Sequence, residues 1–304
     1  MTLHYSFELP TTKVGAAAEF ITAAAIAEIA TAAESCGYDA VHVTDHPAPD
    51  SKWLDHGGHH ALDPFVALSF AAAATSTIKL LTNIYVAAYR NPFLGAKMIQ
   101  SLDMLSGRRL ILGTGAGYLR PEYRALGVDF DSRGALLDEA LDVLAKIYTG
   151  EDVAYDGAHF SARGVRFRPL PPGGSPPPVW IGGNSKIAVR RAVSRHEGWA
   201  PFNTVGYEAA SRTAGIASVD ELKSAIDWAR AYGTSIGRTQ PLDICFSASV
   251  MLDGKSTDEQ QAVLAGLEGA GVTWVIVSAV GDDRHEVIAN LRNFADRFVT
   301  SAAR

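Results

Sequence analysis

The chain has 304 residues, of which 47% are hydrophobic and 20% charged, so it is long enough for one large α/β barrel or two ordinary domains. A formal net charge of −6 gives no reason to expect nucleic acid or an anionic membrane as a partner. The two cysteines, Cys36 and Cys245, lie far apart in the sequence, and we expect both to be buried thiols in a reducing compartment.

The Ala-rich run from Val14 to Ala33 has nearly the length of a membrane span, but its composition argues against one. Glu19 and Glu28 interrupt the run, and no basic region precedes it as a signal peptide would require. We therefore predict an amphipathic helix here and a cytoplasmic protein.

Short apolar runs alternate with helical patterns through the first half of the chain. The predicted strands are Tyr5–Leu9, Ala40–Thr44, Ile78–Tyr85 and Leu110–Leu112. The predicted helices that follow them are Val14–Ala33, Pro64–Ala74, Phe93–Leu105 and Arg133–Tyr148. This pattern indicates parallel strands joined by helical crossovers.

The alternation breaks between residues 150 and 178, which we predict to be an insertion. Val153–Phe160 has the pattern of a small hairpin that turns at Asp156–Gly157. Residues 169–178 contain six prolines and can form neither a helix nor a central strand. We expect this insertion to cross the barrel mouth or to contact another subunit.

Strands and helices then resume to the end of the chain. The predicted strands are Val179–Ile181, Gly198–Ala200, Leu242–Val250 and Thr273–Val277, and the predicted helices are 186–194, Val219–Tyr232, Asp258–Glu268 and Arg284–Phe298. Eight strands with a helix after each predict a single (β/α)₈ TIM barrel domain over residues 1–304. An open, doubly wound sheet is the alternative.

In such a barrel the active site lies at the C-terminal ends of the strands, so residues that are distant in sequence come together there. His46 is the best candidate for a general acid or base, because imidazole titrates near neutral pH; the alternative is a structural histidine bonded to a neighbouring loop. Asp45 could orient His46 or accept a hydrogen bond from a ligand, or it could cap a helix. Glu8, Trp53 and Tyr118 are candidates for contact with the substrate.

Two glycine-rich stretches follow strands. Gly113, Thr114, Gly115, Ala116 and Gly117 could leave bare backbone against which a planar ligand lies, or could form a tight turn. The dinucleotide fingerprint fails here because Tyr118 stands where the third glycine should be. Gly182, Gly183, Asn184 and Ser185 precede a helix and could bind a phosphate at its N-terminus, although Gly-Gly-Asn-Ser is also ordinary turn chemistry.

His56, His59 and His60, with Asp55 beside them, invite a metal interpretation. His56 and His60 are four residues apart, but the glycines of this loop disfavour the helix that a zinc motif with that spacing requires. We predict no metal site, and expect a loop that faces the substrate or the solvent.

Taken together, these segments resemble the bacterial-luciferase-like flavin oxidoreductases, and more narrowly their coenzyme F420-dependent branch. The resemblance runs in order over about two thirds of the chain. Its segments are Val43–His46, Tyr89–Pro92 through Ala96–Lys97 to Leu105–Arg108, Gly113–Gly117 with Glu122, Gly127, Arg133 and Asp138–Glu139, and Pro178–Gly183 through to Gly198–Trp199.

The resemblance implies a barrel that holds F420, or alternatively FMN, at its mouth. It places His46 beside the reactive ring, Asp45 in contact with it, a non-prolyl cis peptide at Asn83–Ile84 and the phosphate at Gly182–Ser185. It also implies a homodimer. The activity would be hydride transfer between reduced deazaflavin and a small organic substrate, or alternatively an FMN-dependent monooxygenase reaction with O₂. From other classes, a cofactor-binding protein without turnover and a metal-assisted hydrolase remain as hypotheses.

The sequence departs from the better-known deazaflavin dehydrogenases at two positions. They carry a tryptophan four residues after the histidine, where this chain has Asp50, and Trp53 is the nearest indole. Their acidic residue just after the glycines has no clear counterpart, because Ala116 and Tyr118 occupy that region. Glu8, Tyr118 or a loop histidine could relay the proton instead.

Overall fold

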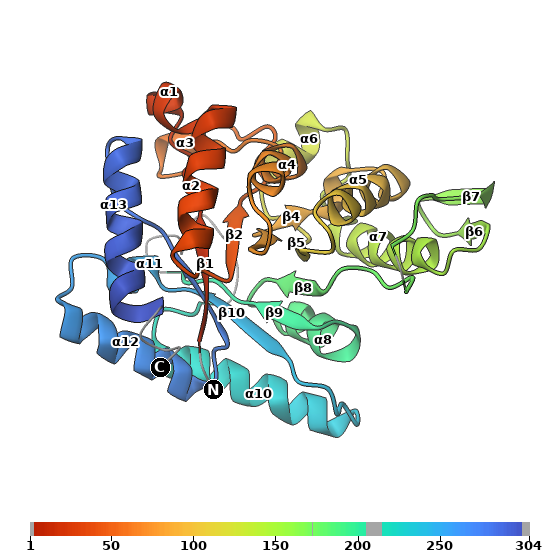
Figure 1. Ribbon diagram of the computed structural model, residues 1–304. Helices are drawn as coiled ribbons and strands as arrows, with labels where there is room; N and C mark the ends of the chain where they lie inside the picture. The colour runs from red at the N-terminus through yellow and green to blue at the C-terminus, as the bar shows by residue number, and fades with distance from the viewer. Residues whose placement is uncertain (1–2, 172, 205–214, 300–304) are drawn as a thin grey trace.

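Eight parallel strands close into a barrel (Figure 1). The computed structural model describes residues 3–171, 173–204 and 215–299. The barrel strands are β1 (His4–Glu8), β2 (Ala40–Val43), β3 (Lys79–Thr82), β5 (Leu110–Gly115), β8 (Val179–Gly182), β9 (Gly198–Ala200), β10 (Asp243–Ser247) and β11 (Trp274–Val277). β1 pairs with β11, and β3 pairs with β5, which closes the ring. The predicted (β/α)₈ barrel is confirmed, and the open sheet was the wrong alternative.

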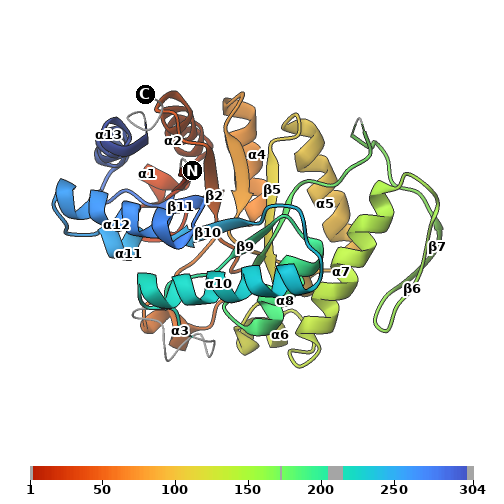
Figure 2. The same cartoon turned by 90° about the horizontal axis from the view of Figure 1, so that it is seen from below.

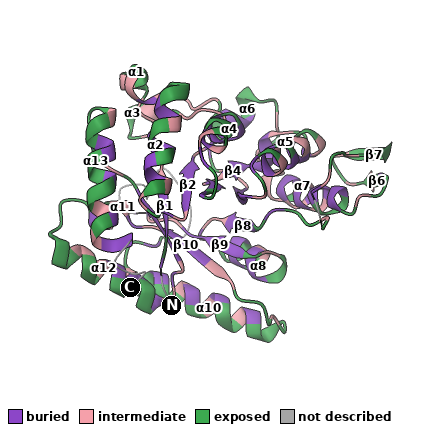
Figure 3. Ribbon diagram, viewed as in Figure 1, coloured by how far each residue is buried: buried purple, intermediate pink, exposed green. Residues whose placement is uncertain are grey.

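Helices surround the barrel, as the two perpendicular views show (Figures 1 and 2). They are α2 (Ala23–Ser35), α4 (Pro64–Ala74), α5 (Pro92–Leu105), α7 (Arg133–Tyr148), α8 (Lys186–Arg195), α10 (Val219–Ser235), α12 (Thr257–Ala270) and α13 (Arg284–Phe294). Their inner faces are buried and their outer faces exposed (Figure 3). Local sequence sets the helix ends: Asp63 caps α4 directly before Pro64, and Ser256 with Glu259 forms a capping box on α12.

Strand residues alternate between the barrel interior and the helices. On β1, Ser6 points inward, where its hydroxyl lies 2.9 Å from Nδ1 of the buried His42, while Tyr5 and Phe7 pack outward. Glu8 shares the inward face with Ser6 and stands at the C-terminal rim. Burial lowers the pKa of His42 to about 3, so this histidine is neutral inside the barrel.

The Ala-rich run is not the one continuous helix that we predicted. It forms a 3-10 turn at Val14–Ala16, α1 (Ala17–Phe20) and then α2, because Thr22 leaves the helix and caps α2 by accepting the Ala25 N–H. Among the described residues no single helix is long and apolar enough to cross a membrane; only Val14–Phe20 and Ala23–Ser35 taken together are, and they meet at 72°.

Two predicted strands and one helix end earlier than expected. The strand predicted to reach Tyr85 stops at Thr82, a cis peptide joins Asn83 to Ile84, and β4 (Tyr85–Val86) then pairs with β5. Residues 242–250 divide into β10 and the short helix α11 (Ser249–Leu252). The last predicted helix ends as α13 at Phe294 and continues as a π-helical turn, Ala295–Val299.

Between α7 and β8 the chain forms an antiparallel hairpin, β6 (Val153–Asp156) and β7 (Ser161–Val165), at one side of the molecule (Figure 1). Its turn spans residues 157–160, later than predicted, because the Glu139 carboxylate accepts the backbone N–H groups of His159 and Phe160. The proline-rich segment contacts Arg108, whose Nη2 donates to Ser175 Oγ at 3.0 Å. That contact lies at the N-terminal rim, opposite the mouth; Pro172 lies outside the described residues.

Candidate functional site

His46 lies at the C-terminal rim, three residues beyond the end of β2. Its Nδ1 atom is 3.3 Å from Oε2 of Glu122, and its side chain is 11% exposed. Glu122 belongs to a short helix at the mouth, α6 (Arg120–Ala125), and its side chain is fully buried. A carboxylate beside Nδ1 accepts a hydrogen bond from Nδ1–H, so Nε2 is the ring nitrogen left for a ligand.

Glu122 accepts two further hydrogen bonds. Tyr89 Oη donates to Oε2 at 2.6 Å, and the backbone N–H of Ala48 donates to Oε1 at 3.2 Å. Burial raises the pKa of Tyr89, and the Glu122 carboxylate raises it further, so the phenol remains a donor. The buried carboxylate is therefore held by a side chain, a backbone group and the histidine that it orients.

Three aromatic rings from the mouth loops surround His46. The ring centroids of Trp53, His59 and Tyr118 lie 4.5, 4.9 and 6.0 Å from that of His46. Trp53 belongs to α3 (Ser51–Asp55), and Asp50 caps this helix by accepting the Trp53 N–H. The indole thus reaches the histidine even though Asp50 stands at the position where we looked for a tryptophan. Burial, with His46 nearby, lowers the pKa of His59.

The Asp45 side chain faces the protein. Its Oδ2 accepts hydrogen bonds from Arg90 Nη1 at 2.6 Å and from the Val86 N–H at 2.9 Å, and Oδ1 accepts from Arg90 Nη2 at 3.0 Å. Arg90 also bonds Asp63, the cap of α4, at 3.1 Å. Asp45 therefore ties the end of β2 to the segment after the cis peptide, and its contact with a cofactor remains a prediction.

The cis peptide expected from the resemblance is present at Asn83–Ile84, and the half-buried Ile84 side chain packs between two glycines. A Cβ added to Gly115 would lie 2.5 Å from Ile84 Cδ1, and one added to Gly182 would lie 2.8 Å from the same atom. A Cβ on Gly113 would lie 2.0 Å from Thr82 O. These glycines make room for neighbouring protein atoms.

The remaining residues of the first glycine stretch also have partners within the protein. Thr114 Oγ1 donates to Tyr85 O at 2.8 Å, the Ala116 carbonyl accepts from the Tyr123 hydroxyl, and Gly117 has a positive φ of 69°. Because β5 extends to Gly115, the stretch is a strand with a loop after it and not an open turn. Whether its backbone also touches a cofactor remains a prediction.

The Gly182–Ser185 stretch forms the turn between β8 and α8. Gly183 has φ +115°, and the Asn184 amide group exchanges two hydrogen bonds with the backbone of Phe202, at 2.9 and 3.0 Å. Ser185 Oγ caps α8 by accepting the Ala188 N–H at 3.2 Å. Both side chains thus have structural roles, and the first backbone N–H groups of α8 are what the turn offers to an anion.

Glu8 is a second acid at the mouth. Burial raises its pKa to about 6, although Lys13 acts in the opposite direction. A carboxyl group with this pKa exchanges a proton near neutral pH. His56 Nδ1 lies 2.7 Å from the backbone carbonyl oxygen of Lys52.

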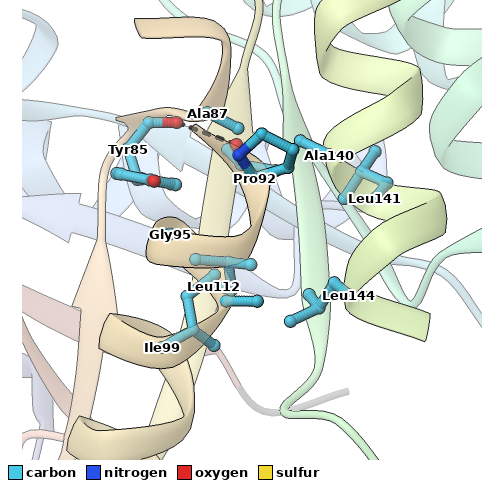
Figure 4. Close-up of a pocket in the computed structure, with 11 residues that line it drawn as sticks. Tyr85, Ala87, Pro92, Gly95, Ile99, Leu112, Ala140, Leu141 and Leu144 are labelled. Carbon is cyan, nitrogen blue, oxygen red and sulfur yellow. Dashed lines mark hydrogen bonds between the residues drawn. The ribbon is translucent and has the colours of Figure 1, made fainter. Parts of the chain in front are cut away.

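Two hollows lie away from these residues. One, of only ≈ 10 Å³, is enclosed by apolar side chains of β4, α5, β5 and α7, among them Tyr85, Ile99 and Leu144 (Figure 4). The other, of ≈ 470 Å³, lies between α11, α12 and α13. Thr114 is the one candidate site residue that lines the first hollow, and none lines the second.

Sequence reasoning missed Glu122, Tyr89 and Arg90 as site residues. All three belong to the segments that carry the family resemblance, but the sequence offered no reason to assign any of them a role in the site. The structure brings His46, Trp53 and Tyr118 together, and places Ile84 against Gly182 at the same rim. Residues from β2, β3, β5 and β8 therefore converge on one mouth.

Comparison with known proteins identifies relatives of this chain. A protein of Mycobacterium tuberculosis with no assigned activity is 30% identical over 291 residues, 89% of this chain and 93% of that protein. An F420-dependent glucose-6-phosphate dehydrogenase of Gordonia bronchialis is 30% identical over 191 residues, 60% of this chain and 54% of that enzyme.

Two solved structures share the fold at low sequence identity. An F420-dependent secondary alcohol dehydrogenase, solved with an F420–acetone adduct, matches with a TM-score of 0.76 and 15% identity over 100% of both chains. The oxygenating component of 3,6-diketocamphane monooxygenase from Pseudomonas putida, solved with FMN, matches with a TM-score of 0.76 and 16% identity over 99% of both chains. The family model for luciferase-like monooxygenases matches residues 3–294, and the chain belongs to this family of oxidoreductases.

Proposed function

We propose that this protein is an F420-dependent oxidoreductase, which exchanges a hydride between reduced deazaflavin and a small organic substrate. One observation carries the proposal: His46, oriented by the buried Glu122, lies at the same rim as Ile84 and the Gly182–Ser185 turn. The relatives named as F420-dependent dehydrogenases support the choice of cofactor.

The residues at the mouth fit a ring with a phosphate-bearing side chain. Asn83 and Ile84 are half-buried and offer an apolar and amide surface, and the first turn of α8 offers backbone donors to a phosphate. The deazaflavin, when bound, supplies or accepts two electrons as a hydride. Asn83, Ile84 and the α8 turn would hold it, and Gly115 and Gly182 would let Ile84 keep its place.

His46 handles the proton that accompanies the hydride. When a carbonyl substrate is reduced, its oxygen gains a proton from His46 Nε2; when an alcohol is oxidised, Nε2 receives the hydroxyl proton. Glu122 remains a carboxylate and stabilises the imidazolium through Nδ1–H. Because the proton moves at Nε2, the protein needs no proton transfer through Glu122 itself.

Trp53 and Tyr118 indicate a substrate with a flat or apolar part, because both rings lie beside His46 at the mouth. Glu8, with its pKa of about 6, is the other group that could exchange a proton with such a substrate. Dehydrogenation of a small alcohol, or the reverse reduction, satisfies both features.

The second candidate is an FMN-dependent monooxygenase that uses reduced flavin and O₂. The likeness in fold to an FMN-bound monooxygenase supports it, because flavin and deazaflavin share the ring outline and the phosphate. Oxygen uptake in the presence of a flavin reductase and NADH would identify this activity.

Titration of deazaflavin fluorescence and absorbance with the protein tests the main proposal. We expect saturable changes with deazaflavin, and loss of hydride transfer but retention of binding in His46→Gln. Tight FMN binding together with an unchanged deazaflavin spectrum at saturating protein would contradict the proposal.

We also propose that two copies associate through α4 and α5. Val66 and Phe70 on α4 are 57% and 46% exposed, and Leu94 on the adjacent α5 is 59% exposed, which together make an apolar face. Phe70→Glu should shift the sedimentation coefficient to that of a monomer, whereas Val165→Glu on the hairpin should not. A wild-type monomer at micromolar concentration would contradict this proposal.

A further inference from the structure

Helix α8 carries four cations, and two of them have carboxylate partners. Arg191 forms two hydrogen bonds with Asp138 at 2.6 and 2.8 Å, and Arg195 pairs with Asp142 at 2.5 Å. Lys186 and Arg190 are exposed and make no ion pair with any described residue. Their charges are therefore available to an anionic ligand.

Lys186 and Arg190 lie over an aromatic platform on the neighbouring helix. Trp228 and Tyr232 of α10 are stacked, with ring centroids 5.8 Å apart and planes at 5°. Lys186 Nζ lies 5.5 Å from the Trp228 ring, and Arg190 Cζ lies 5.9 and 5.7 Å from the two rings. Such contacts hold a long side chain in place without neutralising its charge.

This pair stands next to the turn to which we assign the cofactor phosphate. Lys186 follows Ser185 directly as the first residue of α8, and Arg190 lies one helical turn further, ~6 Å along the axis. α8 and α10 pack side by side (Figures 1 and 2), and the cations of α8 lie over the rings of α10. A ligand that extends beyond its phosphate along this surface meets two successive cations.

We propose that Lys186 and Arg190, supported by Trp228 and Tyr232, bind a carboxylate-bearing extension of the cofactor beyond its phosphate. The inference rests on the proposed function. FMN ends in a phosphate monoester, whereas the deazaflavin coenzyme continues through a phosphodiester into a chain of carboxylates. The net charge of −6 repels a polyanion in general, so its attraction must come from local cations such as these. The platform thereby favours the longer cofactor.

Fluorescence titration of two ligands tests the inference: the coenzyme with its oligoglutamate chain, and the tail-free deazaflavin alcohol. Surface ion pairs are individually weak, so we expect Lys186→Ala/Arg190→Ala to weaken binding of the tailed coenzyme about tenfold at low salt. Binding of the tail-free ligand should stay within about twofold. Arg195→Ala, which removes one positive charge from the same helix, should leave both affinities unaltered.

Salt dependence of the wild-type protein provides an independent readout that requires no variant. Affinity for the tailed coenzyme should fall more steeply with ionic strength than affinity for the tail-free ligand, because exposed charges are screened. Equal affinities and equal salt dependence of the two ligands would overturn this inference while leaving the proposed function intact. Absence of binding by either deazaflavin would overturn both.

Discussion

We expect Glu122→Gln to move the proton on the His46 ring from one nitrogen to the other. The reason is the arrangement of the three groups that donate to the Glu122 carboxylate, which are the Ala48 N–H, the Tyr89 hydroxyl and His46 Nδ1. The Ala48 N–H can only donate, so the glutamine oxygen must take the place of Oε1 and its NH₂ group the place of Oε2. The Tyr89 hydroxyl can rotate and accept from this NH₂ group. His46 Nδ1 must then also accept, and we expect the ring proton to move from Nδ1 to Nε2.

The effect of each substitution on the free energy of unfolding follows from the same three hydrogen bonds. In Glu122→Gln the Ala48 N–H keeps its acceptor and the new NH₂ group finds two, but the Tyr89 O–H loses the oxygen to which it donated. We expect this variant to lose about 1–3 kcal/mol. In Glu122→Ala three donors lose their acceptor, of which the Tyr89 O–H is buried and the His46 Nδ1–H and Ala48 N–H are partly buried. At about 1–3 kcal/mol for each donor, we expect a loss of about 3 kcal/mol or more. Urea denaturation of the two variants measures this difference.

Nitrogen-15 chemical shifts of histidine-labelled protein report the tautomer directly. The chain has nine histidines, and the His46→Gln spectrum assigns the signal. Tyr89→Phe is the matched control: it removes one hydrogen bond from Glu122 but should leave the proton on Nδ1. A wild-type protein with its proton on Nε2, or a Glu122→Gln variant with an unchanged tautomer, would refute the role that we give to Glu122.

Arg90→Ala leaves the buried Asp45 carboxylate without its cation, and we expect unfolding free energy to fall by about 3–5 kcal/mol, but by clearly less in an Asp45→Asn background. Because the pKa of Glu8 is raised to about 6, the folded state holds its proton more tightly than the unfolded chain, so stability falls as pH rises from about 4.5 to 6. This change amounts to about 2 kcal/mol, and Glu8→Gln should remove it; parallel pH profiles of the two proteins would show otherwise. Gly115→Ala places a Cβ 2.5 Å from Ile84 Cδ1, and should cost about 1–2 kcal/mol in denaturation experiments, a loss that Ile84→Val should reduce by removing that methyl group.

The barrel could be predicted because strands buried on both faces leave short, bounded apolar runs. Helices with strong end signals were also predicted closely: Pro64–Ala74 and Arg133–Tyr148 match α4 and α7. The hydrophobic pattern did not predict the structure where the backbone changes conformation without a change in residue type. Residues 242–250 are mainly apolar, with Asp243, Ser247 and Ser249 among them, and nothing in their periodicity separates β10 from α11. The break at Asn83–Ile84 was expected only from the resemblance to a family.

The partners of His46 were harder to predict, because they depend on tertiary contacts. Glu122 lies 76 residues from His46 and is flanked by Arg120 and Arg124 in a polar segment, so the sequence suggested an exposed side chain. The spacing of Trp53 from His46 gave no support for a contact, yet the turn capped by Asp50 brings the two rings to 4.5 Å. The sequence shows which residue types are available, but the tertiary fold decides which of them come into contact.

Asp45 and His46 are adjacent in sequence, and both depend on the short segment that ends at Tyr89 and Arg90. Arg90 binds Asp45, and the neighbouring Tyr89 binds Glu122, which in turn orients His46. Both partners follow the cis peptide by only a few residues, so the segment that carries Ile84 also fixes the charges behind the histidine. A ligand that displaces Ile84 therefore acts on the two carboxylates through one piece of backbone. The glycines that face Ile84 leave room for this segment, and thereby support the backbone that holds the partners of Asp45 and His46.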